Sequence, residues 1–157
     1  MADLDIELTR GELEEYLATQ RTARVATAAA DGTPHVVPLW FVWLDGAMFL
    51  NSTLGNVTTD NMIERGKATA VMDDGDTYDA LRGAVVTAHA ERADDDPRIP
   101  EVERTWSDKY LGGNEVPYRL WKNRAWFRLD PERTASWDFR KIPNARARRD
   151  AAREDRG

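Results

Sequence analysis

The sequence predicts a mainly β fold of the α+β class, an antiparallel barrel with a few helices at its edges. Three observations favour this fold. Residues 31–53 have the pattern of a β-hairpin. Roughly six or seven short strand-like runs follow one another, and most are joined by hairpin turns. The two or three helical patterns do not alternate with these strands, which argues against a doubly wound parallel sheet.

The hairpin at 31–53, DGTPHVVPLWFVWLDGAMFLNST, carries the strongest local signal. Asp45 and Gly46 stand between two apolar runs, and an Asp-Gly pair favours a two-residue hairpin turn. The first run, 35–44, is apolar at both parities instead of alternating. Because successive strand side chains point to opposite faces, both faces of this strand should be covered. One can line the core, and the other needs a helix, a partner subunit or a flat ligand.

The hairpin is flanked by a helix and a strand before it and by a helix after it. The first helix should span 10–18, with Thr9 as N-cap and Glu12 completing a capping box. A strand at 23–28 follows it. After the hairpin, a Gly-containing loop leads into a short helix that Thr58 or Thr59 would cap and Gly66 would end.

The second half of the chain should contain four more strands, at 67–72, 83–92, 125–129 and 134–139. The acidic loop at 73–79 should be a charged turn from which Tyr78 packs back. A helix should run from near Pro97 to residue 110, and residues 112–121 should form a loop or short helix. Asp130 and Pro131 should form the turn between the last two strands.

Size and composition exclude several classes of protein. The 157 residues fit one domain, which we place at 1–144, followed by a charged tail or helix at 145–157. A net charge of −6 argues against a nucleic-acid binder, and no apolar run approaches the ~20 residues that span a membrane. The absence of cysteine excludes disulfides and thiolate chemistry, and fits a cytoplasmic protein. The six tryptophans predict core and dimer-interface packing.

The sequence gives little support for a hydrolytic site or a metal site. His35 and His89 are the two side chains suited to act as a base near neutral pH, and both fall in predicted strands without a G-x-S-x-G motif. We expect them to face solvent or to be satisfied within the sheet. The acidic loop at 73–79 lacks the register of a calcium-binding EF-hand. We therefore expect no catalytic side chain and no metal site.

Two adjacent features suit a ligand better. The polar segment at 52–61 leads into a helix, and hydroxyls, amides and free N–H groups at a helix N-terminus suit an anion. Ordinary helix capping explains the same composition. Trp40, Phe41, Trp43 and Trp137 could stack on a planar ring, although core packing is the simpler explanation of each alone. A ligand with a flat apolar head and a phosphate tail would match both features.

Four stretches carry a resemblance to a known family: 21–53 with its G-x-P-x-x-x-P-x-W-F strand, NM at 61–62, DGDTYDALRGAVVTAHAE at 74–91 and RTASWDFRKI at 133–142. The chain resembles the split β-barrel flavin and deazaflavin oxidoreductases related to pyridoxamine 5'-phosphate oxidase. The last two stretches look most like the actinobacterial deazaflavin-dependent branch. The resemblance implies an FMN-binding-protein-like split barrel that forms a homodimer, with two cofactor sites at the subunit interface.

The resemblance also implies a cofactor and the residues that hold it. The deazaflavin F420 comes first and FMN second. The ring system would lie along Val37, Pro38, Leu39 and Trp40. The phosphate would lie near Ser52, Thr53, Asn56, Thr58, Thr59 and Asn61. The C-terminal strand, of the same or the other subunit, would add Trp137, Arg140 and Lys141.

One departure from the family pattern concerns the phosphate. Relatives place Lys or Arg between the third strand and the following helix, whereas this chain has neither between Arg24 and Arg65. The positive charge would then come from Arg140, Lys141 or Arg82, or the affinity for a phosphate cofactor would be reduced.

The implied function is an oxidoreductase that transfers hydride from F420 or FMN to a planar conjugated small molecule. In that reading the cofactor supplies the chemistry and no side chain is named as acid or base. The alternative is a non-catalytic split-barrel protein that binds FMN, F420, haem or another planar ligand. A dimer without a ligand is a third possibility. The expected partners are a second copy of the chain and a small planar substrate, with no nucleic acid and no membrane.

Overall fold

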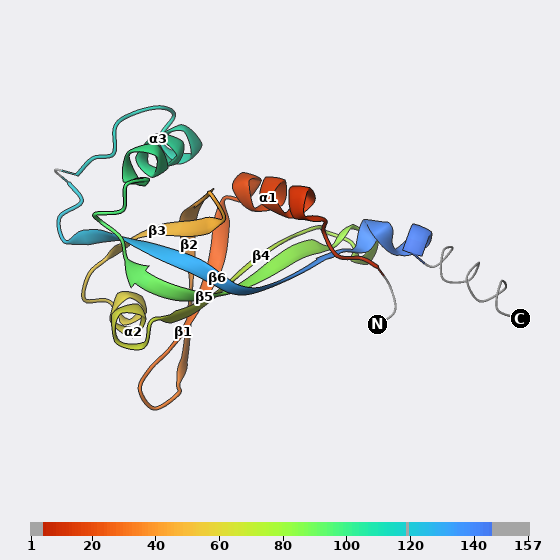
Figure 1. Ribbon diagram of the computed structural model, residues 1–157, viewed down its shortest axis with the longest axis horizontal. Coiled ribbons are helices and arrows are strands. Elements are labelled where there is room, and N and C mark those ends of the chain that lie inside the picture. Colours follow the sequence, from red (N-terminus) through yellow and green to blue (C-terminus); the bar gives the residue numbers. More distant parts are fainter. Residues whose placement is uncertain (1–4, 119, 146–157) are drawn as a thin grey trace, which may run out of the picture.

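The computed structural model describes residues 5–118 and 120–145, and within them six strands close into one antiparallel barrel (Figure 1). The strands are β1 (Thr22–Ala28), β2 (Pro34–Leu44), β3 (Ala47–Thr53), β4 (Lys67–Asp74), β5 (Arg82–Arg92) and β6 (Arg124–Asp138). Their order around the barrel is β1-β2-β3-β6-β5-β4, and each neighbouring pair is antiparallel. The predicted mainly β antiparallel barrel is confirmed.

The turn between β2 and β3 forms where the sequence predicts it. Asp45 has φ 50° and Gly46 has φ 74°, and both positive values are those of a type I′ hairpin turn. The turn pairs Leu44 with Ala47, and this register carries on to Phe41 and Leu50. The hairpin is therefore specified by local sequence.

The helices α1 (Arg10–Thr19), α2 (Val57–Arg65) and α3 (Ile99–Tyr110) pack around the barrel. The capping box of α1 at Thr9 and Glu12 is present as predicted. The N-cap of α2 is Asn56 and not Thr58 or Thr59, because the Asn56 amide oxygen accepts the Thr59 N–H and Thr59 becomes the third helical residue. Gly66 ends α2 at φ 62°, as predicted. Helix α3 begins at Ile99, two residues after Pro97.

The last two predicted strands are one continuous strand, β6. Asp130 pairs with His89 and Pro131 with Ala88, so the expected turn at Asp130-Pro131 does not exist. The pairing shifts register between Thr87 and Ala88, where β6 carries one extra residue. Proline has no N–H to give to a ladder, and a bulge is one of the places in a sheet that tolerates it. The Asp130-Pro131 pair, which resembles a turn in the sequence, therefore lies at a β-bulge in the structure.

Small side chains from one half of the barrel and large side chains from the other half fill its interior. The inward-facing alanines of β1, β4 and β5, such as Ala23, Ala70 and Ala84, are buried. Larger side chains from β2, β3 and β6, such as Phe41, Leu50 and Phe127, occupy the space they leave. Tyr16 and Leu17 of α1 join the same cluster. A second apolar cluster lies outside the barrel, between β3, β6 and α3, and it includes Phe49, Trp106 and Trp126.

Gly83 on β5 is a position where only glycine fits. A Cβ built there would lie 2.3 Å from Cζ2 of Trp137 and 2.8 Å from the Met72 carbonyl oxygen. Gly83→Ala is therefore expected to lower the free energy of unfolding by about 1–3 kcal/mol, because the indole or the strand must move. The matched control is Gly11→Ala in α1, where a Cβ meets nothing within 4 Å. That change should be neutral or stabilising by about 0.5 kcal/mol. Urea denaturation of both variants measures the difference, and equal stabilities would contradict the packing.

Two short 3-10 helices, η1 (Tyr78–Ala80) and η2 (Phe139–Lys141), meet at the far end of β4, β5 and β6. The Tyr78 ring lies 5.0 Å from that of Phe139, but Tyr78 stays 64% exposed, so the predicted packing of this side chain is met only in part. The predicted tail lies outside the described residues from 146 onward, and the division at 144/145 stays a prediction.

No helix among residues 5–118 and 120–145 is long and apolar enough to cross a membrane.

Candidate functional site

The outer face of β2 changes character along its length. Val36, Pro38 and Trp40 point away from the barrel, and Val36 and Trp40 remain 59% and 46% exposed. Val42, two residues further on, is fully buried under α3. Within one chain a helix therefore covers only the second half of the doubly apolar strand. Covering of the first half by a partner or a ligand stays a prediction.

Helix α3 brings aromatic side chains to this face. Val102 and Trp106 lie on its buried side, and Figure 1 shows the helix above the β2–β3 end of the barrel. The Trp40 ring stacks on Tyr110 of α3 at 4.4 Å and 4°. The Trp106 ring is 6.0 Å from Trp40 and meets Trp121 edge-on at 6.4 Å. The half-exposed Trp40 is thus held flat by the helix.

Helix α3 also fixes two polar groups against β2. The Tyr110 hydroxyl donates to the Phe41 carbonyl at 2.8 Å, and burial raises the pKa of Tyr110 to about 12. Lys109 Nζ donates to the same carbonyl at 3.1 Å and lies 4.4 Å from the Phe41 ring centroid. Burial lowers the pKa of Lys109 to about 8. These contacts make the Trp40–Tyr110 stack a rigid part of the barrel wall.

A cleft of about 280 Å³ opens beside this stack on the outer face of the barrel. It is lined by Pro38, Leu39, Trp40, Asn51, Trp106, Trp121 and Arg124. Three of the predicted ring-contact residues, Pro38, Leu39 and Trp40, therefore lie together in one concave site. The fourth, Val37, does not line the cleft. Indole walls and an apolar floor suit a planar ring system.

Arg124 is the charged residue of the cleft. Its Nε donates to Asn51 Oδ1 at 2.5 Å and its Nη2 to the Asn51 carbonyl at 2.7 Å. Its guanidinium lies 4.7 Å from the Trp121 ring centroid. Because Arg124 begins β6 and pairs with Thr53 at the end of β3, it stands next to the segment that lacks cations. The sequence reading missed Arg124, together with Asn51, Trp106 and Trp121.

The residues predicted to hold a phosphate build the N-terminus of α2. Asn56 caps the helix and donates to Ser52 Oγ at 3.3 Å, and the Thr59 hydroxyl donates to the Thr53 carbonyl at 3.1 Å. Thr58 is buried, and Asn61 is buried with its amide donating to Thr27 Oγ1 at 3.0 Å. The backbone N–H groups of the first two helical residues have no intrahelical partner. The structure thus brings these residues together, with the side-chain donors of Asn56, Thr59 and Asn61 already in hydrogen bonds.

Asn56 permits a test that separates capping from ligand binding. Asn56→Ala should lower the free energy of unfolding by about 1 kcal/mol, because the Thr59 N–H loses its acceptor. Asn56→Asp keeps the acceptor, and its charge complements the helix dipole, so stability should stay within a few tenths of a kcal/mol. Thermal unfolding measures both. If Asn56→Asp is as unstable as Asn56→Ala, the cap is not the role of this side chain.

Trp137, Arg140 and Lys141 lie at the opposite end of the molecule from the cleft within one chain. Figure 1 shows β6 running from the α3 end to η2 at the far end of the barrel. Arg140 pairs with Asp138 at 2.6 Å and Lys141 with Glu12 at 2.6 Å. Arg82, the third candidate cation, pairs with Asp74 at 2.9 Å. All three predicted cations therefore already have a carboxylate partner, and their contribution to a partner's site stays a prediction.

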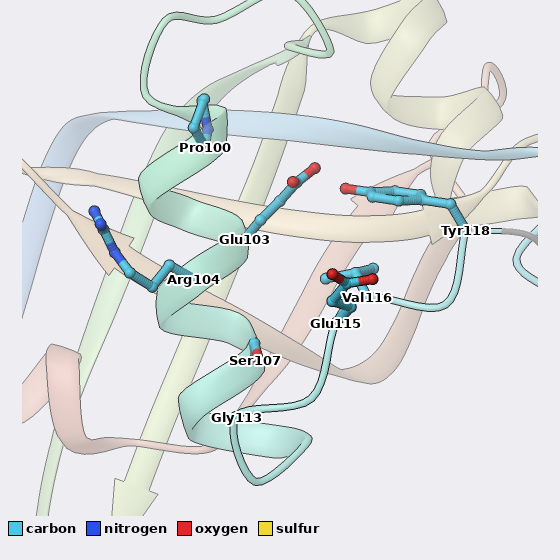
Figure 2. A pocket seen from close by; sticks show the side chains of 8 residues that line it. All are labelled: Pro100, Glu103, Arg104, Ser107, Gly113, Glu115, Val116 and Tyr118. Atoms are coloured by element: carbon cyan, nitrogen blue, oxygen red, sulfur yellow. The ribbon is translucent and has the colours of Figure 1, made fainter.

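A second cleft of about 380 Å³ lies between α3 and the segment that follows it (Figure 2). Figure 2 shows Glu103 and Tyr118 pointing toward one another across its mouth, while Arg104 points away. Burial raises the pKa of Glu103 above its ordinary value. Tryptophan walls of the kind found beside β2 are absent from its lining residues, which include Pro100, Ser107 and Val116. We therefore take the cleft beside β2 as the candidate site.

The described part of the chain contains no candidate metal site. Among these residues no group of three or more His, Asp or Glu side chains is placed to hold a metal ion. His89 is half exposed and lies 3.8 Å from Glu91, and neither His89 nor His35 lines the candidate cleft.

Comparison with known proteins decides the family. A sequence model of pyridoxamine 5'-phosphate oxidase matches residues 9–138, most of the chain. The chain belongs to the pyridoxamine 5'-phosphate oxidase family. The predicted resemblance is therefore confirmed, and with it the split-barrel fold. No curated protein matches the sequence significantly.

Solved structures of this family agree with the fold. A conserved hypothetical protein of Mycobacterium tuberculosis is 26% identical with a TM-score of 0.79, and the match covers 91% of each chain. An FAD-binding protein of Mesorhizobium loti is 20% identical with a TM-score of 0.66, covering 83% of this chain and 94% of that one. An F420 reductase is 22% identical with a TM-score of 0.62, covering 77% of this chain and 94% of that one. The fold is thus shared with a protein described as FAD-binding and with one described as an F420 reductase.

Proposed function

We propose that this protein binds a flavin-type cofactor, F420 in preference to FMN, on the outer face of β2 and acts as an oxidoreductase on a planar conjugated small molecule. The observation that carries the proposal is the cleft between β2, α3 and β6, with walls formed by Trp40, Trp106 and Trp121. Its donor set fits such a cofactor, since apolar and aromatic surface is joined to one guanidinium. Membership of the family and the neighbours named above support the same reading.

The residues of the chain would bind and orient, and the bound ring would supply hydride chemistry. Trp40, held flat by Tyr110, would give one apolar surface for a ring, and Trp121 would limit access of water from the loop side. Arg124 would offer a charged donor to the polar part of the ligand. Such positioning contributes to rate because it replaces a chance encounter with a fixed geometry. We assign no side chain as acid or base.

We also propose a homodimer in which a second copy covers the exposed half of β2. Val36 is 59% exposed beside Pro38 and Trp40, and an apolar strip of this kind is typical of an interface. Light scattering coupled to gel filtration measures the mass in solution. Val36→Glu should shift a dimer toward monomer, because a carboxylate would be buried without a partner. A monomeric wild type would overturn this part of the proposal.

The proposed function is tested by titrating the purified protein with F420 and with FMN while following tryptophan fluorescence and the visible spectrum. We expect saturable quenching, because three tryptophans line the cleft. The dissociation constant should be lower for F420 than for FMN. Trp121→Phe should remove part of the quenching. Trp43→Phe is the matched control, since Trp43 donates to Glu14 outside the cleft and its removal should leave the quenched signal in place. Absence of quenching by both cofactors, with neither copurifying, would reject the proposal.

The alternative of a non-catalytic binder is favoured by the lack of Lys and Arg between Arg24 and Arg65. It would take FMN, F420, haem or another planar ligand without turnover. The two readings separate when reduced cofactor is mixed with quinone, enone or biliverdin-like acceptors. If the reduced cofactor is oxidised faster with the protein than without it, the protein is an enzyme. Binding without any such acceleration supports the binder.

A further inference from the structure

Arg124 is half buried and has only neutral hydrogen-bond partners. Both of its hydrogen bonds go to oxygens of Asn51, and its ring contact is with Trp121. In the part of the chain that the structure describes, no carboxylate lies within ion-pair distance of it. Arg98 and Arg128, whose side chains are 27% and 24% exposed, both pair with Asp96. Arg124 is thus a partly desolvated cation whose charge the protein leaves uncompensated.

The energetics of this arrangement favour an anion. Burial lowers the pKa of Arg124, although a guanidinium stays protonated at any ordinary pH. The charge therefore carries a desolvation cost, and the oxygens of Asn51 accept hydrogen bonds from it without supplying a compensating negative charge. Nε and Nη2 are engaged by Asn51, which leaves Nη1 free to donate. An oxyanion in the cleft would complete the set of partners.

Among the described residues, Arg124 is the one cation that lines the cleft, whereas the nearby Lys109 donates to the Phe41 carbonyl. Thr53, the partner of Arg124 in the β3–β6 ladder, leads into a segment without Lys or Arg, and the first turn of α2 carries Asp60. Asp60 already complements the positive end of that helix, so the helix N-terminus is a weaker attractor for an anion. The predicted cations Arg82, Arg140 and Lys141 are paired elsewhere. Among the described lining residues of the cleft, the positive charge is therefore that of Arg124.

We propose that Arg124 is the anion-recognition residue of the β2 cleft, and that the cleft selects a planar ring system bearing a phosphate or a carboxylate. The inference deepens the proposed function, since it takes the same cleft as the ligand site. A phosphate would come from the cofactor, and a carboxylate from a substrate. Both are oxyanions that a guanidinium recognises with directed N–H donors.

The experiment compares charged and neutral probes of the same ring. Tryptophan quenching is titrated with FMN against riboflavin, which lacks the phosphate, and with 2-naphthoate against 2-naphthamide, for wild type, Arg124→Gln and Arg104→Gln. Arg104 is exposed on α3 and points away from Glu103 and Tyr118 in Figure 2, so it is the matched control. Arg124→Gln should weaken binding of the anionic probe of each pair by about 10- to 100-fold, and binding of the neutral probe by less than about 2-fold.

The outcomes distinguish the source of the anion. Loss confined to FMN identifies the cofactor phosphate, and loss confined to 2-naphthoate identifies a substrate carboxylate. If wild type binds neither F420 nor FMN in the cofactor titration but binds 2-naphthoate through Arg124, the proposed function fails and the inference stands. If both flavins bind and Arg124→Gln changes neither preference, the inference is overturned while the proposed function stands. An equal loss in Arg104→Gln would also overturn it, since a general charge effect would then explain the data.

Arg124 also ties Asn51 to β6, so a second variant guards against misfolding. Arg124→Lys keeps the positive charge and should retain most of the preference for the anionic probe. Raising NaCl from 0.05 to 0.5 M should reduce the preference of wild type, because screening weakens a partly exposed ion pair. If Arg124→Gln does not fold, a wild-type preference that salt does not change rejects the inference, and one that salt reduces supports it.

Discussion

Replacing Trp106 by alanine is expected to lower the free energy of unfolding by about 3–5 kcal/mol. Trp106 is 2% exposed, and its ring meets those of Trp40, Tyr110 and Trp126 at 6.0, 4.8 and 5.3 Å. Removing the indole leaves a cavity under α3 that its rigid aromatic neighbours cannot readily fill. The same change removes one wall of the β2 cleft, so ligand affinity should fall along with stability. Urea denaturation followed by circular dichroism measures the first effect.

Trp106→Phe is the matched variant, because the indole nitrogen is buried without a hydrogen-bond partner among the described residues. A phenyl ring therefore loses volume but no hydrogen bond, and the expected cost is about 1–2 kcal/mol. A loss for Trp106→Phe as large as that for Trp106→Ala would show that the indole N–H, which both variants lack, contributes more than the volume of the ring. Trp106→Ala within about 1 kcal/mol of wild type would contradict the packing of α3 on the barrel.

Features set by neighbouring residues in the chain could be predicted from the sequence. The Asp45-Gly46 turn, the capping box at Thr9 and the glycine end of α2 each depend on a few consecutive residues, and all three are confirmed. The turn expected at Pro131 failed for the opposite reason. Its conformation is fixed by β5, which holds Pro131 opposite Ala88 and continues the ladder beyond it. A non-local pairing overrode a local signal.

The candidate site shows the same division. Pro38, Leu39 and Trp40 were predicted because one strand carries them, and they do line one cleft. The missing cation was sought in the segment after β3, whereas β6 supplies Arg124 through its pairing with Thr53, 71 positions later in the chain. No spacing rule within the segment could reveal that. Trp106 and Trp121 looked like core residues, and their place in the cleft depends on where α3 packs.

Removing the Asp96 carboxylate is expected to be the other severe change, about 2–4 kcal/mol for Asp96→Ala. The side chain is 3% exposed, accepts from Arg98 Nη2 at 2.9 Å and from Arg128 Nη1 at 2.6 Å, and also accepts the Arg98 backbone N–H at 2.9 Å. The alanine variant leaves two guanidinium groups short of a partner. The expected cost lies below that of a fully buried pair, because both arginines are about a quarter exposed and Arg128 keeps Asp130 and Glu91.

The same carboxylate makes stability depend on pH in a defined direction. The arginines hold the pKa of Asp96 far below its ordinary value, so the unfolded chain binds the proton more readily than the folded one. This contribution to stability is complete above the unfolded pKa of about 4 and is lost as pH falls below it. Thermal unfolding of wild type should therefore be nearly constant from pH 7 to 5 and fall below pH 4. Asp96→Asn should be less stable at pH 7 and should fall less steeply.

Asp95→Ala is the matched control for both measurements, since Asp95 is exposed in the same loop. It should stay within about 0.5 kcal/mol of wild type and keep the wild-type pH profile. Asp74 and Asp138 also have lowered pKa values beside Arg82 and Arg140, so Asp96→Asn should retain a part of the acid sensitivity. Parallel acid profiles for wild type and Asp96→Asn would show that Asp96 has no special share. The stability lost in acid would then reside in the carboxylates around η2.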